Sequence, residues 1–481
     1  MIFNLVKSLI IIFIISSNLS VIKGSNLCSA ENKDSIKEQK YFIVDSILII
    51  GNKYTKNHII LRELLFNVND TIRENEYDYK IKKSIENLNN TSLFNFVFID
   101  TIGGDGKKNI KIKVIERWYL WPFPILELSE RNFNTWWQDK DLKKINYGFY
   151  FVKENFRGRR EDLKFLIRRG FEEIYKISYY VPYLNKNQTI GLGYSFGLSR
   201  NKSVAYRTFN NKLEYFRVND FYIRENIESY LQLTLRKDFF TTNYFLLGYN
   251  NLTFADTLIK QNDFYSEEGL KTNKYFSVYY LYKNDRRDNK SYPLEGYYFD
   301  MDITKLGLGL MKKEVLNIFY MRSTFRKYFK LKDKFYFASG LRAKLSNNDF
   351  QPFFVKQGLG FGNDYVRGYE YYVVDGISYG ISKNNFKYEI IKPHITKFKF
   401  IKNEKFNMIH YALYLNLFAD FGYAYDYKPI NQLSNNLSNS FLYGYGIGLD
   451  LVTYYDIVFR IEYSFNKMNE KGIFINFVAP I

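Results

Sequence analysis

From Tyr119 to the last residue, apolar and polar residues alternate in short segments, which are separated by loops rich in Asn, Lys, Asp and Gly. In the segment YALYLNLFADFG, one side carries Leu413, Leu415, Leu417 and Ala419, and the other carries Tyr414, Asn416, Phe418 and Asp420. Because successive side chains of a strand point to opposite faces, this spacing predicts a strand with an apolar and a polar face.

A second segment, IVFRIEYS, sets Phe459, Ile461 and Tyr463 against Arg460, Glu462 and Ser464. Charged residues on the inner face are what a water-filled transmembrane barrel requires. A soluble sandwich also has an apolar and a polar face, so alternation alone does not separate the two architectures. Residues 119–481 allow about 16 antiparallel strands, at roughly 20–25 residues for each strand and its connection.

In residues 41–118, the spacing of the apolar residues indicates helices as well as strands. YFIVDSILIIGN predicts a strand that ends at the turn residue Gly51. A helix is expected after it, with Thr55 as its N-cap and apolar residues at helical spacing, and a second from Glu74 to Leu88. Two strands, at 93–102 and 109–118, are then separated by the turn GGDGKK. The predicted order is β-α-α-β-β.

The first residues, MIFNLVKSLIIIFIISSNLS, have Lys7 before an apolar run and then small and polar residues, which is the layout of a secretory signal peptide. We expect a signal peptide at 1–30, cleaved near residues 24–30, and a short linker at 31–40. An uncleaved anchor is the alternative, but the run is shorter than the about 20 residues that a spanning helix needs. Cys28 is the only cysteine, so no disulfide framework is expected.

The leader, the long all-β region and the preceding domain together favour the barrel over the sandwich. The predicted fold is mainly β, with an N-terminal α+β domain followed by an antiparallel transmembrane β-barrel of about 16 strands. Aromatic residues make up 20% of the chain, with 45 Tyr and 45 Phe, and they suit the aromatic girdles of such a barrel. Codon bias in an AT-rich genome is the other explanation of this composition.

The formal net charge is +19. A basic chain can bind nucleic acid, but here the lysines are scattered and the chain is expected to be exported. We therefore expect no nucleic-acid partner, and anionic lipid or lipopolysaccharide headgroups as the counter-charges.

The sequence contains short matches to catalytic and phosphate-binding motifs, but the local structure predicted around them is not the one that these motifs require. GYSFG matches the nucleophile elbow of serine hydrolases, but Ser195 falls within an alternating strand, and the chain has only three histidines. The Gly-rich stretches GLGFG and GYGIG precede no helix that would hold a phosphate. We expect no enzyme activity, no cofactor and no metal site.

The stretch GFGNDYVRGYEYYVVDG places a single arginine, Arg367, among apolar and aromatic residues. An arginine inside a barrel is costly unless acceptors satisfy it. Asp420 lies on the polar face of its strand, so we predict a charge-assisted Arg367–Asp420 pair that pins a long loop inside the barrel. The alternative is two unrelated residues, one on an exposed loop and one in a solvated lumen.

Two sets of residues resemble known families. Residues 41–118 resemble a POTRA domain, the periplasmic module of outer-membrane insertases, in element order and in Gly51-Asn52, RELL, Asp70, TSLFNFV and VIERW. VRGY and FADFG look like the two signature motifs of the outer-membrane insertase superfamily (the bacterial surface antigen family) that includes BamA, TamA and the two-partner secretion transporters. ENFRGRRE and DRRDNKSYPLEGYYF also resemble that family.

The resemblance implies that Arg367 and Asp420 form the loop-barrel lock of this family. Val366, Gly368, Tyr369, Phe418 and Gly422 would frame it. It also implies a protein of the bacterial outer membrane, with the POTRA-like domain in the periplasm.

The function that the resemblance implies is the assembly of outer-membrane proteins. The POTRA-like domain would capture clients by strand addition, and a lateral seam of the barrel would insert them. The expected partners are unfolded outer-membrane proteins, accessory lipoproteins and outer-membrane lipids. The alternative is a single-POTRA secretion pore, or transporter, for one dedicated partner protein.

Overall fold

The computed structural model describes residues 41–481, apart from 104–105, 129–144, 171, 219, 313, 348, 398–407, 428–433, 454–456 and 477–481. The predicted signal peptide, the linker and Cys28 therefore lie outside the described residues. Within the described ranges, no helix has the length and apolar character needed to cross a membrane.

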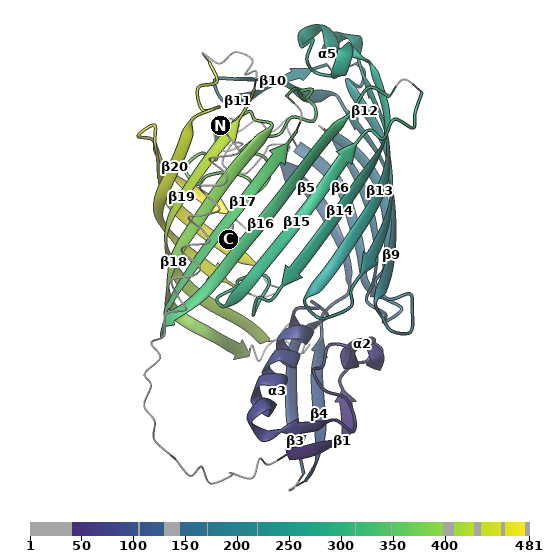
Figure 1. Ribbon diagram of the computed structural model, residues 1–481, viewed down its shortest axis with the longest axis vertical. Coiled ribbons are helices and arrows are strands. Elements are labelled where there is room, and N and C mark those ends of the chain that lie inside the picture. The colour runs from purple at the N-terminus through teal and green to yellow at the C-terminus, as the bar shows by residue number, and fades with distance from the viewer. Residues whose placement is uncertain are drawn as a thin grey trace, which may run out of the picture. The chain divides into compact units, whose positions relative to one another are not determined.

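The first described elements form a small α+β unit, called here the N-terminal unit (Figure 1). Its four-stranded sheet has the order β2-β1-β4-β3, with β1 parallel and β3 antiparallel to β4. The bounds are β1 Tyr41–Ile50, α2 Asn57–Leu61, β2 Thr71–Arg73, α3 Glu74–Asn89, β3 Phe94–Ile102 and β4 Lys107–Glu116. Buried apolar side chains of the strands and helices form one core.

Two details of this unit differ from the prediction. Strand β2, between the two helices, has three residues, too few for alternation to be visible in the sequence. Helix α2 is only five residues long, and Thr55 does not cap it, because the Thr55 hydroxyl donates to Glu116 at 2.7 Å instead. A buried tertiary acceptor has replaced the local cap.

A sixteen-stranded antiparallel sheet follows and curls round as a barrel (Figure 1). Each strand pairs with its neighbours in sequence from β5 to β22, except that β9 pairs with β12 and the β10–β11 hairpin stands apart. The first half comprises β5 Leu120–Leu128, β6 Ile145–Phe156, β7 Glu161–Gly170, β8 Glu172–Val181, β9 Ile190–Asn201, β12 Arg224–Leu235, β13 Thr241–Phe254 and β14 Thr272–Asp285.

The second half comprises β15 Gly296–Leu306, β16 Ile318–Lys332, β17 Phe335–Ser346, β18 Ser378–Lys397, β19 Met408–Tyr425, β20 Phe441–Val452, β21 Val458–Asn466 and β22 Lys471–Asn476. The hairpin comprises β10 Ser203–Phe209 and β11 Lys212–Arg217. Two short helices, α5 Asp256–Gln261 and η1 Glu267–Gly269, lie between β13 and β14.

Exposure along the strands is the reverse of that in a soluble protein. In β19, Asp420 is 0% exposed, whereas Leu417 is 48% exposed. In β21, Arg460 and Glu462 are 0% exposed, whereas Ile461 is 42% exposed. A sandwich would bury the apolar face, so this pattern separates the two architectures in favour of the barrel. The predicted fold class is confirmed.

The strand connections alternate between the two ends of the barrel, because the sheet is antiparallel throughout. The β6–β7, β8–β9, β12–β13 and β14–β15 connections therefore share one end, which we call the near end. The β9–β12, β17–β18, β19–β20 and β21–β22 connections share the other, the far end. Ser195 lies in the middle of β9, opposite Tyr230 of β12, and not at a strand-to-helix turn.

Candidate functional site: the arginine loop and the near-end junction

The connection between β17 and β18 packs inside the barrel. We call its residues 349–377 the arginine loop. Leu359, Val366 and Tyr369 of this loop are at most 2% exposed and share a core with residues of β18, β19 and β20. A long connection of this kind is held in place only if its polar groups also find partners.

Arg367 binds two buried carboxylates inside the barrel. Its Nε and Nη2 donate to the two carboxylate oxygens of Asp420, at 2.7 and 2.6 Å, and its backbone N–H donates to the same carboxylate at 3.3 Å. Its Nη1 donates to Glu462 at 3.1 Å. The guanidinium carbon also lies 3.9 Å from the centroid of the Phe418 ring. All three charged side chains are 0% exposed, so the structure brings the two predicted partners together and adds a third.

The geometry explains the glycines around Arg367. A Cβ atom on Gly422 would lie 2.5 Å from a methyl group of Val366, and one on Gly444 would lie 1.8 Å from the carbonyl oxygen of Arg367. Gly368 has φ +90°, a conformation that side chains other than glycine rarely adopt. The backbone of the loop therefore lies directly against strand β20, and the Val366 side chain lies against strand β19.

Residues after Arg367 are held by the far-end turn that joins β21 to β22. Asn466 donates to the carbonyl oxygen of Gly368 at 2.9 Å, and the backbone N–H of Lys467 donates to the Tyr369 hydroxyl at 3.2 Å. The Gly368 N–H donates to Glu370 at 2.9 Å. Of the framing residues predicted from the sequence, Phe418 lies against the Arg367 guanidinium and Gly422 against Val366, whereas Gly368 and Tyr369 bind the β21–β22 turn.

Sequence reasoning missed Glu462, Gly444 and a second buried pair. Arg460 of β21 donates to both carboxylate oxygens of Asp450 of β20, at 2.5 and 2.6 Å. The alternation in IVFRIEYS places Arg460 and Glu462 on the inner face, but it does not identify their partners. Those follow from the register, which sets Asp450 opposite Arg460.

The β10–β11 hairpin holds the far side of the arginine loop. Val373 donates its N–H to the carbonyl oxygen of Asn211 at 2.8 Å, and Thr208 donates to Asp375 at 2.8 Å. Asn211 also donates its N–H to Asn435, in the β19–β20 connection, at 2.9 Å. Three far-end connections, one of which is the arginine loop, are therefore bound to one another.

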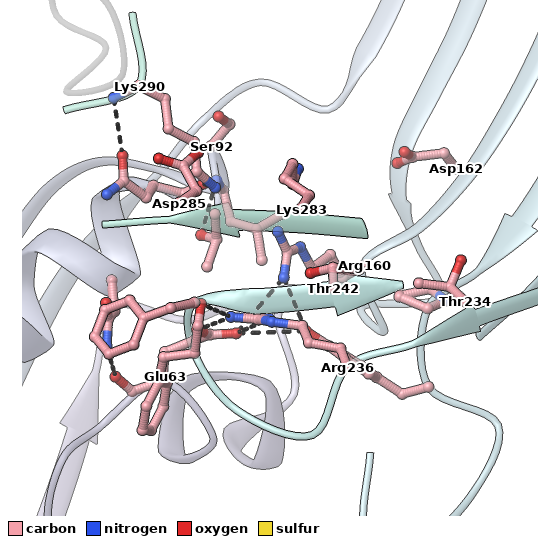
Figure 2. A pocket seen from close by; sticks show the side chains of 18 of the residues that line it. Glu63, Ser92, Arg160, Asp162, Thr234, Arg236, Thr242, Lys283, Asp285 and Lys290 are labelled. Carbon is pink, nitrogen blue, oxygen red and sulfur yellow. Dashed lines mark hydrogen bonds and ion pairs between the residues drawn. The ribbon is translucent and has the colours of Figure 1, made fainter. Parts of the chain in front are cut away.

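Glu63, which follows α2, joins the N-terminal unit to the near end of the barrel (Figure 2). It is 1% exposed and accepts hydrogen bonds from Arg236 at 2.8 and 2.9 Å, and Arg160 lies 3.5 Å away. Burial alone would raise the pKa of Glu63, but the charge and hydrogen bonds of Arg236, with Arg160 and Arg62, lower it to about 2.

These residues line a polar cavity of about 310 Å³ between the N-terminal unit and the near-end turns. Figure 2 shows Glu63, Arg160 and Arg236 at its wall, with Lys283 and Lys290 nearby. Among the residues that the structure describes, no group of His, Cys, Asp and Glu is arranged to hold a metal ion. Because residues of both the N-terminal unit and the near-end turns line this cavity, we interpret it as part of the contact between them.

No family model matches this chain, and no curated protein matches it. Among solved structures, it is similar to CdiB from Escherichia coli, at 11% identity and a TM-score of 0.51 over 95% of this chain and 92% of that one. BamA from Haemophilus ducreyi lacking POTRA domains 1–3 matches with 14% identity and a TM-score of 0.49, over 90% and 83% of the two chains. CdiB from Acinetobacter baumannii matches with 14% identity and a TM-score of 0.48, over 91% and 74%. At these identities, the likeness to the Escherichia coli protein shows the fold.

Proposed function

We propose that this chain is an assembly factor of the bacterial outer membrane, which inserts other barrel proteins at a lateral seam. The reversed exposure of the strands supports a lipid-facing barrel, since apolar side chains cover its outside. Most strands are at least nine residues long, which suffices to cross a bilayer. The signature motifs VRGY and FADFG add the resemblance to the insertase superfamily.

The observation that carries the proposal is the arginine loop locked inside the barrel. Arg367, Asp420 and Glu462 are fully buried there, and the β10–β11 hairpin is bound across the loop. A passive pore would have to release these contacts before a polypeptide could pass. An assembly factor that inserts clients at a lateral seam can keep these contacts, and the arginine loop then stabilises the strands next to the seam.

The seam lies between the first and last strands of the sheet order, β5 and β22. Strand β5 contains Pro122 and Pro124, which have no N–H to donate. Because they are two residues apart, the missing donors face the same edge of the strand. Proline in a sheet is largely confined to edge strands. This composition supports a weak edge at which a client strand can pair.

The N-terminal unit supplies the capture step in this proposal, as a periplasmic POTRA-like domain. Strand β3 stands at one edge of its sheet, and an extended client segment can add there as a further strand. The partners are unfolded outer-membrane proteins, with accessory lipoproteins and outer-membrane lipids. The mechanism needs no cofactor.

A second candidate is a secretion pore for one dedicated protein. The observation that favours it is the single α+β unit before the barrel in the described part of the chain. The main assembly factors of the insertase superfamily that this chain resembles usually carry several such domains. In that case, the arginine loop would have to leave the lumen during transport.

One experiment separates the two candidates. The purified chain is placed in phosphatidylethanolamine–phosphatidylglycerol liposomes, and a second, unfolded barrel protein is added. Folding is followed by the gel mobility of unheated samples, and conductance is recorded across planar bilayers. We expect insertion several-fold faster than into empty liposomes, with little conductance. No acceleration, together with a stable conductance, would overturn the assembly proposal in favour of the pore.

A further inference from the structure

The turn between β14 and β15, residues 286–295, enters the barrel from the near end. Its Tyr292 is 5% exposed, and its hydroxyl donates to Asp450 of β20 at 2.7 Å. The ring of Tyr292 lies 4.8 Å from that of Tyr414, and the Lys387 ammonium is 4.2 Å from its centroid. Tyr292 thus lies in the interior of the barrel, although the strand that carries its partner, β20, is the fifth after β15 in the sheet order.

Asp450 connects this turn to the arginine loop. It accepts from Arg460, whose Nη1 lies 3.7 Å from Glu462, and Glu462 accepts from Arg367 at 3.1 Å. Asp450, Arg460 and Glu462 are 0% exposed, so solvent screens these charges little. The charges alternate in sign along the series, which makes each group a partner of the next.

The same turn also contacts the N-terminal unit. Asn90, at the end of α3, accepts from the Lys290 N–H at 3.2 Å and donates to the carbonyl oxygen of Asp288 at 3.3 Å. The Lys290 ammonium donates to the carbonyl oxygen of Asn90 at 3.0 Å. Within the turn, Asn289 accepts from the N–H of Tyr292 at 3.0 Å. The turn that carries Tyr292 is therefore bound to the N-terminal unit through Asp288 and Lys290.

We propose that Tyr292, Asp450 and Arg460 are positioning residues for the arginine loop, and that they couple it to the docking of the N-terminal unit. Undocking frees the turn, withdraws Tyr292 from Asp450 and weakens the hold of Arg460 and Glu462 on Arg367. Such coupling requires one element that has two arrangements, here the arginine loop in a locked and a released position. Docking of the N-terminal unit and the contacts of Arg367 must both favour the locked position. The inference goes beyond the proposed function, because it holds for a pore as well as for an assembly factor.

Hydrogen exchange of the full chain in detergent micelles tests this coupling. Tyr292→Phe keeps the ring and removes one hydrogen bond to a carboxylate. We expect amides of residues 364–370 to exchange roughly tenfold faster, as the loss of one such bond predicts. Tyr230→Phe is the matched control, since that hydroxyl donates to Asn250 at 3.0 Å in the distant β12–β13 wall. It should leave residues 364–370 unchanged.

A second pair of variants acts from the N-terminal unit. Asn90→Ala removes the side-chain contacts to the turn, whereas Asn89→Ala alters an exposed neighbour in the same helix. Asn90→Ala should accelerate exchange in both the turn and residues 364–370, and Asn89→Ala in neither. Faster exchange confined to the turn, in Asn90→Ala and in Tyr292→Phe, would overturn the coupling. This experiment measures loop mobility and not client insertion. The coupling can therefore be wrong while the chain still inserts clients, and the coupling can be right while the chain inserts none.

Discussion

The guanidinium of Arg367 donates to both carboxylate oxygens of Asp420, at 2.7 and 2.6 Å, where neither residue is exposed to solvent. Planar, two-point contacts of this kind fix the orientation of the arginine as well as its position. The loop that carries Arg367 and the strand that carries Asp420 are therefore held in one relative placement. Each of the following predictions tests a consequence of such contacts.

Breaking the Arg367–Asp420 pair should destabilise the barrel strongly. Asp420→Arg or Arg367→Asp leaves like charges buried together, and removing one partner of a buried pair typically costs roughly 3–5 kcal/mol. Urea unfolding followed by tryptophan fluorescence measures the loss. The double exchange, Arg367→Asp with Asp420→Arg, should recover part of it.

Arg207→Ala is the control for the charge exchange. Arg207 pairs with Glu214 at 2.6 Å on the hairpin surface, with 44% and 36% of the side chains exposed. Its loss should leave the stability close to that of the wild type, because exposed ion pairs contribute little. Wild-type stability in either single exchange variant would contradict the lock.

Gly444→Ala should displace the arginine loop. Its Cβ would lie 1.8 Å from the carbonyl oxygen of Arg367, and a backbone atom cannot move aside as a flexible side chain can. We expect a loss of about 1–3 kcal/mol, as for other overpacked sites, together with faster exchange in the loop. Gly380→Ala in β18 is the control, because nothing lies within 4 Å of its Cβ, and it should change stability by less than about 0.5 kcal/mol. Equal effects of the two substitutions would contradict the close approach.

Docking of the N-terminal unit should weaken in acid. The pKa of Glu63 is lowered to about 2 in the docked state, from an ordinary value of 4.5. Since the docked pKa is the lower one, the contribution is complete above about pH 4.5 and is lost as the pH falls toward 2. The difference corresponds to roughly 3 kcal/mol. Glu63→Gln should weaken docking already at pH 7 and remove this pH dependence.

Energy transfer between two labels measures this docking. With Cys28 replaced by Ser, labels are placed by Tyr79→Cys on α3 and Leu184→Cys in the β8–β9 turn, both at exposed positions. Glu76→Gln, at a surface ion pair of α3, is the control and should behave as the wild type. A wild-type signal that stays constant between pH 4.5 and 2 would show that Glu63 does not hold the unit.

Replacing the two prolines of β5 should strengthen the seam. Pro122→Val with Pro124→Val restores two N–H donors on one edge of the strand. We expect higher stability and slower client insertion in the liposome assay. Phe123→Val, between the prolines on the opposite face, changes composition without adding a donor and serves as the control. Unchanged insertion in the double variant would argue against a seam at β5.

The alternation of apolar and polar residues was enough to predict the barrel strands and the faces of their side chains. In β19 it placed Asp420 inward and Leu417 outward, because a strand has a period of two whatever surrounds it. The same reasoning assigned Arg460 and Glu462 to the interior. Local patterns also identified the strand, the two helices and the paired strands of the N-terminal unit, but not the three-residue β2 or the length of α2.

Only the tertiary structure decided which of these inward groups are partners. Glu462 as a second acceptor for Arg367, the Asp450–Arg460 pair and the entry of Tyr292 all depend on strand register and on how connections fold back. The contact of Glu63 with Arg236 joins residues 173 positions apart. A linear pattern encodes the face of each strand, whereas these contacts arise from the placement of segments that are distant in sequence. For this reason the lock was predictable as a pair, and its extension through the barrel was not.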